Sequence, residues 1–282
     1  MIRKSPDKRI LAKISFESLF NLKIKETGKW QSRIIGEGIE FDSLREYQNG
    51  DSTKKINWGA TARTGNLIIN QTTSTKTVNI HVIIDANITQ NFGSNIRKSQ
   101  IINELLHTLV DITSNNQDGI KLTVLSEKTQ SHPLKNGKRS LVFYNNVIEK
   151  INYDRVSNIN FYDIKFDKNK FITILITDFI DNKEKNNIMK IIKNSNPIII
   201  LVNDPVELSL PNIGIFEIKN IKNNEHIIID TNDKKFSKEY NKRVNDYMFE
   251  RGNLAKISNK MIEISTNGAH GGEQFIRKFI AG

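Results

Sequence analysis

The sequence predicts an α/β fold, with a mostly parallel sheet flanked by helices and a β-rich region before it. Apolar residues alternate along 78–84 and stop at Asp85, as in a strand. Residues 171–176 are almost continuously apolar, which is typical of a strand covered on both faces. Between these strands, the apolar residues of 102–109 lie on one helix face. Strands and helices that alternate at this spacing favour a parallel sheet.

The first 76 residues differ from the rest of the chain. Apolar residues at mostly helical spacing predict a short helix within 8–24. In 31–76, short apolar pieces alternate with glycine-containing turns, so we expect an irregular, β-rich region. The polar run 71–76 is typical of a connector. We therefore place the helix and β-rich region in 1–76 and the α/β domain in 77–282.

The α/β pattern continues to the end of the chain. Short apolar runs predict strands at 120–125 and 198–202. Apolar residues at helical spacing predict further helices around 147–151, 188–192, 236–247 and 275–280.

Composition narrows the class of protein. The chain has 282 residues, with 42 Lys+Arg against 31 Asp+Glu and a net charge of +11, so nucleic acid or an anionic membrane surface must be considered. It contains no Cys, which excludes disulfides, cysteine zinc sites and a cysteine nucleophile. No apolar run approaches the roughly 20 residues of a spanning helix. We expect a cytoplasmic protein without a membrane span.

The standard catalytic motifs do not occur in the sequence. The run 137–140 carries Gly-Lys but lacks the first glycine of a phosphate-binding loop, because that position is His132. The Gly-rich run 268–272 has the wrong spacing for a dinucleotide site, and we expect it to open the last helix. The five His residues are scattered and form no pair at helical spacing. The sequence therefore predicts no standard catalytic site.

Polar residues at two strand ends are the best candidates for a ligand site. Asp85, Asn87 and Thr89 follow the first parallel strand, and Asp178 follows a later one. Ligands of open α/β sheets bind beyond the carboxyl ends of the strands. Carboxylate, amide and hydroxyl oxygens there could hold Mg²⁺. The alternative is that these residues cap the next helix and satisfy loop amides.

Several motifs occur in a recognisable order. Residues 36–41 follow a Gly-x-Gly-x-Glu-Phe pattern, 45–51 read Arg-Glu-Tyr-Gln-Asn-Gly-Asp, 56–58 read Ile-Asn-Trp and 62–65 read Ala-Arg-Thr-Gly. Later segments, 177–181 and 203–211, agree as well. Together these motifs resemble the signature of the bacterial family known as domain of unknown function 58. The resemblance covers most of the chain.

This resemblance implies a von Willebrand factor A-like (Rossmann-like) domain after the signature region. It implies a non-enzymatic partner or adaptor of a MoxR-type AAA+ ATPase, acting on an unknown client in complex assembly, chaperone-like or stress-related work. The family's domain often carries a metal-ion-dependent adhesion site. Asp85, Asn87 and Thr89 match its first three positions and Asp178 its later Asp, although Asn87 replaces a Ser. Its later Thr has no clear match, and Ser140 is a weak candidate.

The signature residues allow two interpretations: a partner surface, or contacts that fix the β-rich region onto the α/β domain. We favour the second. The two glycines suit turns with positive φ, the tryptophan would bury a large apolar surface, and the two arginines could pair with nearby acidic residues. The residues concerned are Arg45, Glu46, Tyr47, Gly50, Asp51, Trp58, Arg63 and Gly65.

Two other functions remain as alternatives. A nucleic-acid-binding protein would explain the basic excess, but the excess is spread over both regions and no aromatic-plus-basic motif accompanies it. A metal-dependent hydrolase could use Asp85 and Asp178. No general base, phosphate-binding loop or arginine clamp accompanies these two carboxylates, so we favour the interaction module.

Overall fold

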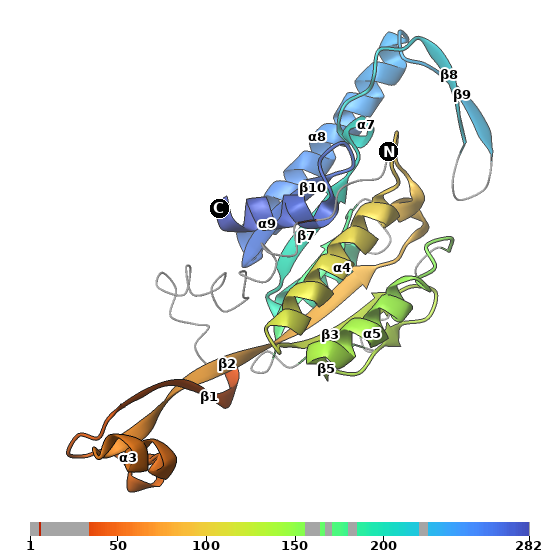
Figure 1. Cartoon of the computed structure of the whole chain (residues 1–282). Helices are drawn as coiled ribbons and strands as arrows, with labels where there is room; N and C mark the ends of the chain where they lie inside the picture. Colours follow the sequence, from red (N-terminus) through yellow and green to blue (C-terminus); the bar gives the residue numbers. More distant parts are fainter. Residues whose placement is uncertain are drawn as a thin grey trace.

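The computed structural model describes Pro6 and residues 34–155, 164–166, 171–179, 185–219 and 225–281. The helix expected within 8–24 lies outside these residues. The described residues form a body with one main sheet and an arm that extends from it (Figure 1).

The body of the protein is built on one sheet. Its strands are ordered β10-β7-β6-β2-β3-β4. β10, β7, β6, β2 and β3 run parallel, whereas β4 and β5 pair antiparallel with β3. The predicted α/β class with a mostly parallel sheet is confirmed. The strands are β2 (Ile68–Asp85), β3 (Gly119–Leu125), β4 (Gln130–Ser131), β5 (Lys135–Asn136), β6 (Ile172–Thr177), β7 (Ile198–Asn203) and β10 (Lys260–Ser265).

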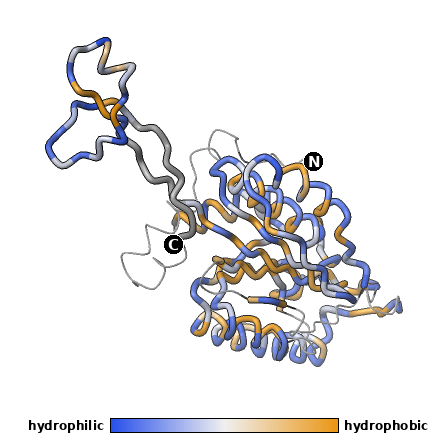
Figure 2. The backbone as a smooth tube through the Cα atoms, turned by 90° about the horizontal axis from the view of Figure 1, so that it is seen from below, coloured by the Kyte–Doolittle hydropathy of each residue, from blue (hydrophilic) through white to orange (hydrophobic). Residues whose placement is uncertain are grey.

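Helices cover both faces of this sheet because alternate strand residues point to opposite sides. Val82 and Ile84 belong to a core with α4, α5 and α9, while Ile83 lies between them in sequence and belongs to a second core with α6 and α8. In Figure 2, hydrophobic segments run through the centre of the body. The helices are α4 (Lys98–Asn115), α5 (Gly137–Ile148), α6 (Lys185–Ser195), α7 (Pro205–Leu208), α8 (Lys234–Ile257) and α9 (Gly271–Ala281).

The structure confirms the predicted start of the last helix, α9, and corrects the bounds of another, α5. The run 268–272 does precede and open α9, as expected, and Gly272 lets α9 approach α4: a Cβ there would lie 1.8 Å from Thr108 Oγ1. The helix expected around 147–151 instead spans Gly137–Ile148. Its buried positions Ser140, Tyr144 and Ile148 recur every four residues, and the first is polar, so the apolar pattern did not reveal where the helix starts.

The β-rich region forms an arm that projects from the body (Figure 1). β1 (Ile34–Glu46) pairs antiparallel with the first part of β2. The short helix η2 (Thr53–Lys55) and α3 (Trp58–Thr64) lie at the end of the arm. The prediction of a connector at 71–76 is wrong, because these residues lie within β2. A polar strand in a two-stranded arm lacks the apolar alternation that marks a half-buried strand.

A β-hairpin and a short helix lie outside the main sheet. β8 (Ile215–Lys219) and β9 (His226–Asp230) form a separate antiparallel hairpin near one end of α8 (Figure 1). The short helix η3 (Ile88–Asn91) follows β2. Among the helices that the structure describes, none has the length and apolar character needed to cross a membrane.

Candidate functional site

The connectivity of the sheet locates its ligand-binding edge. The chain passes from β2 to β3 on one side and later returns to β6 on the other side of β2. The strand order therefore reverses between β2 and β6, and in such sheets ligands bind in the crevice beyond the carboxyl ends of these strands. Asp85 ends β2, and Asp178 follows the last residue of β6. The switch point thus brings the two segments singled out in the sequence to one edge.

Asp85 is buried at this edge. Thr177 Oγ1 donates a hydrogen bond to Asp85 Oδ2 at 3.1 Å and accepts one from the Phe179 amide at 3.0 Å. Asp85 follows the strand parity of Ile83, so its side chain lies on the α6 and α8 face of the sheet. The carboxylate is therefore anchored across the β2–β6 junction.

The segment after Asp85 holds buried polar atoms without partners. Within the described part of the chain, the amide groups of Asn87 and Gln90 and the Thr89 hydroxyl form no hydrogen bond, although the atoms are buried. Both amide side chains are 0% exposed. Buried polar groups are nearly always hydrogen-bonded, so such a cluster calls for an additional partner such as an ion or ligand. Asp85, Asn87 and Thr89 carry oxygens of the kinds that Mg²⁺ prefers, so the chemistry of this set of donors is compatible with magnesium.

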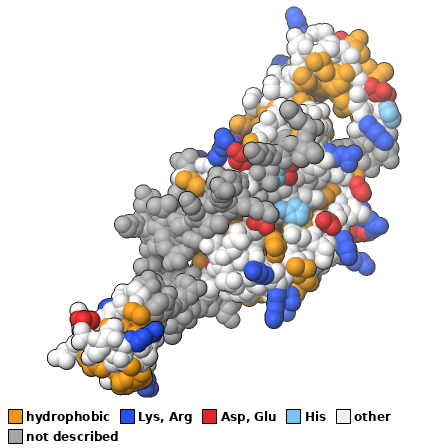
Figure 3. All heavy atoms as spheres, in the orientation of Figure 1, with side chains coloured by type: hydrophobic (Ala, Val, Ile, Leu, Met, Phe, Trp, Pro, Cys, Tyr) orange, Lys and Arg blue, Asp and Glu red, His pale blue; other side chains and the backbone are white. Residues whose placement is uncertain are grey.

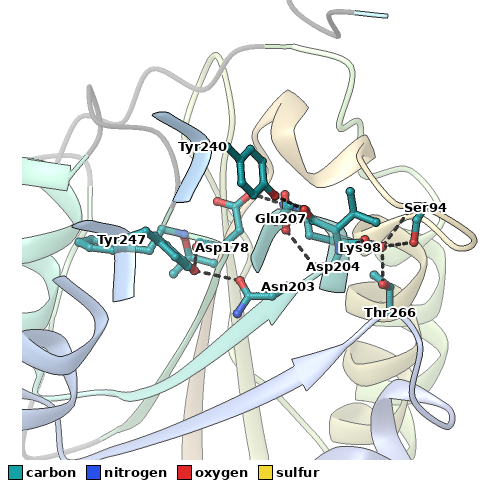
Figure 4. A network of polar contacts seen from close by, with 12 residues as sticks. Ser94, Lys98, Asp178, Asn203, Asp204, Glu207, Tyr240, Tyr247 and Thr266 are labelled. Atoms are coloured by element: carbon teal, nitrogen blue, oxygen red, sulfur yellow. Dashed lines mark hydrogen bonds and ion pairs between the residues drawn. The ribbon is translucent and has the colours of Figure 1, made fainter. Parts of the chain in front are cut away.

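Asp178 has a different partner from the one expected. Lys98 Nζ lies 2.8 Å from Asp178 Oδ2 and 2.6 Å from Glu207 Oε1, and the Lys98 side chain is 0% exposed (Figure 4). Burial opposes the charge on Lys98, but attraction by the two carboxylates outweighs it and raises the pKa of the lysine. Burial, reinforced by the nearby Asp178, raises the pKa of Glu207 despite the lysine. The charge that neutralises Asp178 in this structure is the Lys98 ammonium, whereas the sequence led us to expect a metal ion shared with the Asp85 segment.

Ser140, the weak candidate for the later Thr of the adhesion site, forms its hydrogen bond within α5 rather than with Asp85 or Asp178. Its hydroxyl is buried and donates to the Gly137 carbonyl at 2.6 Å, within the first turn of α5. This bond stays within the helix, so Ser140 has a local structural role.

A second carboxylate network adjoins the lysine (Figure 4). Asp204 Oδ2 accepts hydrogen bonds from the Ser94 amide at 2.8 Å, the Ser94 hydroxyl at 3.0 Å and the Thr266 hydroxyl at 2.6 Å. Burial opposes the charge of Asp204, but these bonds together lower its pKa. Glu207 in turn accepts a bond from the Asp204 amide, which completes the capping box of α7. The loops after β2, β7 and β10 are thereby tied together.

The tyrosines of α8 extend this network to the opposite face. Tyr247 donates to the Asp178 carbonyl at 2.8 Å and to Asn203 Oδ1 at 2.9 Å, and Tyr240 donates to the Val206 carbonyl. Burial raises the pKa of Tyr247, so its hydroxyl stays a donor over the physiological range. The carboxyl ends of β6 and β7 are consequently held in fixed positions.

Lys98 was missed by the sequence reasoning, although a signal was present. It is the first residue of α4, where the helix dipole disfavours a positive charge, and no acidic residue occupies that first turn. A lysine at such a position needs compensation from elsewhere in the fold. Asp178 and Glu207 supply it.

The signature residues form the tip of the arm, which we define as residues 43–71. Arg45 and Asp51 make a two-pronged ion pair, with both N–O distances 2.8 Å, as predicted. This contact lowers the pKa of the Asp51 carboxyl. Gly50 and Gly65 have φ values of +107° and +76°, as predicted for turns. Asn66 Nδ2 donates to Glu46 Oε1 at 3.0 Å, and the Tyr47 amide donates to the Leu67 carbonyl at 2.8 Å.

Three expectations for the signature residues are wrong. Trp58 is 68% exposed and does not bury its indole. The residues do not fix the tip onto the α/β domain either, because the tip lies at the end of the arm, away from the body (Figure 1). Its side-chain hydrogen bonds, among described residues, join partners within 43–71. Arg63 donates to the Gly59 carbonyl of its own helix rather than to an acidic residue. The arm's own strand pairing, rather than contact with the body, holds the tip in place.

Several solved structures are similar to this chain. The BatB protein of Bacteroides thetaiotaomicron has a TM-score of 0.41 and 13% identity over 72% of this chain and 97% of its own. An aerotolerance-related membrane protein of Bacteroides fragilis has a TM-score of 0.41 and 12% identity over 73% and 100%. The SpRpn10 VWA domain has a TM-score of 0.36 and 9% identity over 71% and 94%.

The amino-acid sequence matches the model of one protein family. No curated protein sequence matches the chain. A family model described as "Protein of unknown function DUF58" matches residues 43–248, which include the arm tip, the switch point and most of α8. The order of motifs along the chain had led to the same family. The match spans well over half of the sequence, and the chain belongs to the DUF58 family.

Proposed function

We propose that this protein is a non-enzymatic, cytoplasmic protein-interaction module that acts as partner or adaptor of a MoxR-type AAA+ ATPase and presents an unknown client to it. Membership of the family supports this proposal. The observation that carries it is the set of buried, unpartnered oxygens of Asn87 and Thr89 beside Asp85 at the switch point. They are built to receive something from outside the described fold.

The residue types favour binding over catalysis. Lys98 and Asp178, which could otherwise serve as an acid and a base, are buried and paired with each other, and Glu207, which is partly buried, pairs with the same lysine. Asp85 is fixed by Thr177. The charged groups of this edge therefore support its geometry, and the unpartnered groups of the segment after Asp85 are two amides and a hydroxyl, which bind ligands but are poor proton carriers.

Mg²⁺ is the ligand that these groups fit best. Asp85, Asn87 and Thr89 would hold it, and the ion would offer open positions to an acidic side chain of a partner. Asp178 is left out of this proposal because Lys98 already neutralises it. The role of the chain's own residues is to hold three oxygens in place beyond β2.

The test begins with the chain alone, because an AAA+ ATPase needs Mg²⁺ for its own nucleotide. We would titrate Mn²⁺, as a spectroscopic substitute for Mg²⁺, into the full chain and into Asp85→Asn, with Asp246→Asn on exposed α8 as the matched control. Wild type and the control should bind with the same affinity, and Asp85→Asn should bind at least about 10-fold more weakly, about 1.4 kcal/mol. Equal binding by all three proteins would remove the metal from the proposal.

Partner binding is measured separately. Binding of the purified MoxR-type ATPase of the same organism would be followed by biolayer interferometry on the same three proteins. We expect Asp85→Asn to reduce the affinity while Asp246→Asn leaves it unchanged. If the wild-type chain does not bind the ATPase at all, the partner assignment is wrong.

A further inference from the structure

The arm tip is a self-contained unit. The Asn57 side chain caps α3 through the Ala60 amide at 3.0 Å and also donates to Asn70 at 2.9 Å. Thr61 Oγ1 accepts a hydrogen bond from the Ile68 amide at 3.0 Å. These bonds fix α3 against β2, and the Arg45–Asp51 pair fixes the loop that follows β1. The surface that the tip presents is therefore preorganised, so little ordering cost opposes binding.

This surface is apolar at its centre. Trp58 is 68%, Leu44 48% and Leu67 46% exposed. Figure 3 shows hydrophobic side chains gathered at the end of the arm, with basic side chains beside them. An exposed indole on a rigid element is the kind of residue that dominates the affinity of protein interfaces.

The charge around the apolar centre is positive. Residues 43–71 contain the cations Arg45, Lys54, Lys55 and Arg63 but only the acids Glu46 and Asp51. Arg45 forms an ion pair with Asp51, so the net charge of the other charged residues of the tip is positive. A complementary partner surface would be acidic.

A protein suits this surface better than a membrane. Leu44 and Glu46 are two residues apart on β1, so they lie on the same face of the strand. Insertion of Leu44 into lipid would bring the Glu46 carboxylate to the bilayer, which is costly. A protein pocket can instead offer Glu46 a hydrogen-bond donor at its rim.

We propose that the arm tip docks Trp58 into an apolar pocket with an acidic rim on a partner protein. This inference rests on the proposed function, because it takes the ATPase as the first partner to test. The docking site on the arm tip is distinct from the switch point. Its indole and the cations around it would contact the partner.

The first experiment measures affinity. Biolayer interferometry would compare ATPase binding by the full chain, Trp58→Ala and Phe249→Ala, the last being an aromatic on α8 that is 72% exposed. Trp58→Ala should weaken binding about 30-fold, about 2 kcal/mol, as for a hot-spot residue. Phe249→Ala should leave it unchanged, and Lys54→Glu should weaken it in low salt but less in high salt. Undiminished binding by a folded Trp58→Ala would overturn the proposal.

The second experiment separates this inference from the choice of partner. A photo-crosslinking amino acid would replace Leu67, which is 46% exposed on the tip, or Phe249 in the full chain inside cells, so that the Trp58 indole is kept. A crosslink from position 67 to the ATPase supports both proposals, and a crosslink from 67 alone to another protein with an acidic pocket supports only the docking of the tip. Equal crosslinking from both positions, or none from 67, would refute the docking.

A control addresses membranes. In a Trp30→Phe background the indole of Trp58 is the one remaining tryptophan, since the chain has 2 Trp. Its fluorescence should not shift on addition of anionic phosphatidylserine vesicles. A shift to shorter wavelength that Glu46→Gln enhances would show lipid insertion and overturn the choice of a protein partner.

Discussion

Replacement of Lys98 by Met is the sharpest test of the buried charge network. The substitution keeps an unbranched chain as far as Cε but removes the ammonium that lies 2.8 Å from Asp178 Oδ2 and 2.6 Å from Glu207 Oε1. Both carboxylates then face each other in a buried position. Breaking a buried pair by removing one partner costs about 3–5 kcal/mol. Removing a cation from the start of α4 returns about 0.5 kcal/mol, so we expect a net loss of about 2.5–4.5 kcal/mol.

The pH dependence of this loss has a definite sign. The pKa of Lys98 is raised, so its contribution is fully present below the ordinary lysine pKa and is lost only as the pH rises above it. In Lys98→Met, the already raised pKa of Glu207 should rise further, because the lysine no longer opposes it. The folded variant then binds more protons than the unfolded chain. Its deficit should therefore be largest at pH 8 and smaller at pH 5.5.

The assay is urea denaturation of the full chain followed by circular dichroism at both pH values. Lys234→Met is the matched control, because Lys234 is also the first residue of a helix but is exposed. The control should stay within about 0.5 kcal/mol of wild type. Lys98→Met with Asp178→Asn should be no less stable than Lys98→Met alone. A loss below about 1 kcal/mol, or one that grows as the pH falls, would refute the reasoning.

Two further predictions concern the core. Burial, with a smaller effect from Lys121, lowers the pKa of His81 to about 3. The unfolded chain therefore binds a proton at His81 that the folded chain does not, and the free energy of unfolding falls by about 1.4 kcal/mol for each pH unit below the ordinary histidine pKa of about 6.5. The free energies of unfolding measured by urea denaturation at pH 7.5 and pH 5 should therefore differ by about 2 kcal/mol more in wild type than in His81→Gln, and an identical difference would contradict this. Gly272→Ala should cost about 1–3 kcal/mol by forcing α9 away from α4, measured against Gly252→Ala, whose Cβ meets nothing within 4 Å; equal stability of the two variants would show that the helices can separate freely.

The sheet could be predicted because its signals are local. Residues 171–176 and 198–202 are almost continuously apolar, as burial on two faces demands, and residues 78–84 alternate as in a strand. All three runs lie in strands, with the exception of residue 171. The arm could not be predicted in the same way. Its strand at 71–76 is polar and is stabilised by pairing with β1, a partner that the local pattern does not reveal. Pairing between distant segments has no periodicity that a sequence window can detect.

The candidate site was predictable in part for a similar reason. Asp85 and Asp178 stand directly after strands, so the sheet alone brings them to one edge. Which atoms they contact depends on strand parity and on side chains from other elements. Lys98 reaches Asp178 from α4, 80 residues away, and the indole of Trp58 stays in solvent because the tip never returns to the body. Both outcomes require the three-dimensional arrangement.

The continuity of β2 has a mechanical consequence. One strand of 18 residues starts in the arm tip and ends at Asp85, a length of roughly 55–60 Å. A partner that pulls on the tip along the arm would load the middle strand of the sheet directly, with no hinge or linker to absorb the force. The parallel bonds of β2 to both β3 and β6 would then resist in shear, many at once, and extraction of β2 would dismantle the switch point. The arm is therefore a handle through which an engaged motor could either grip the protein firmly or take it apart.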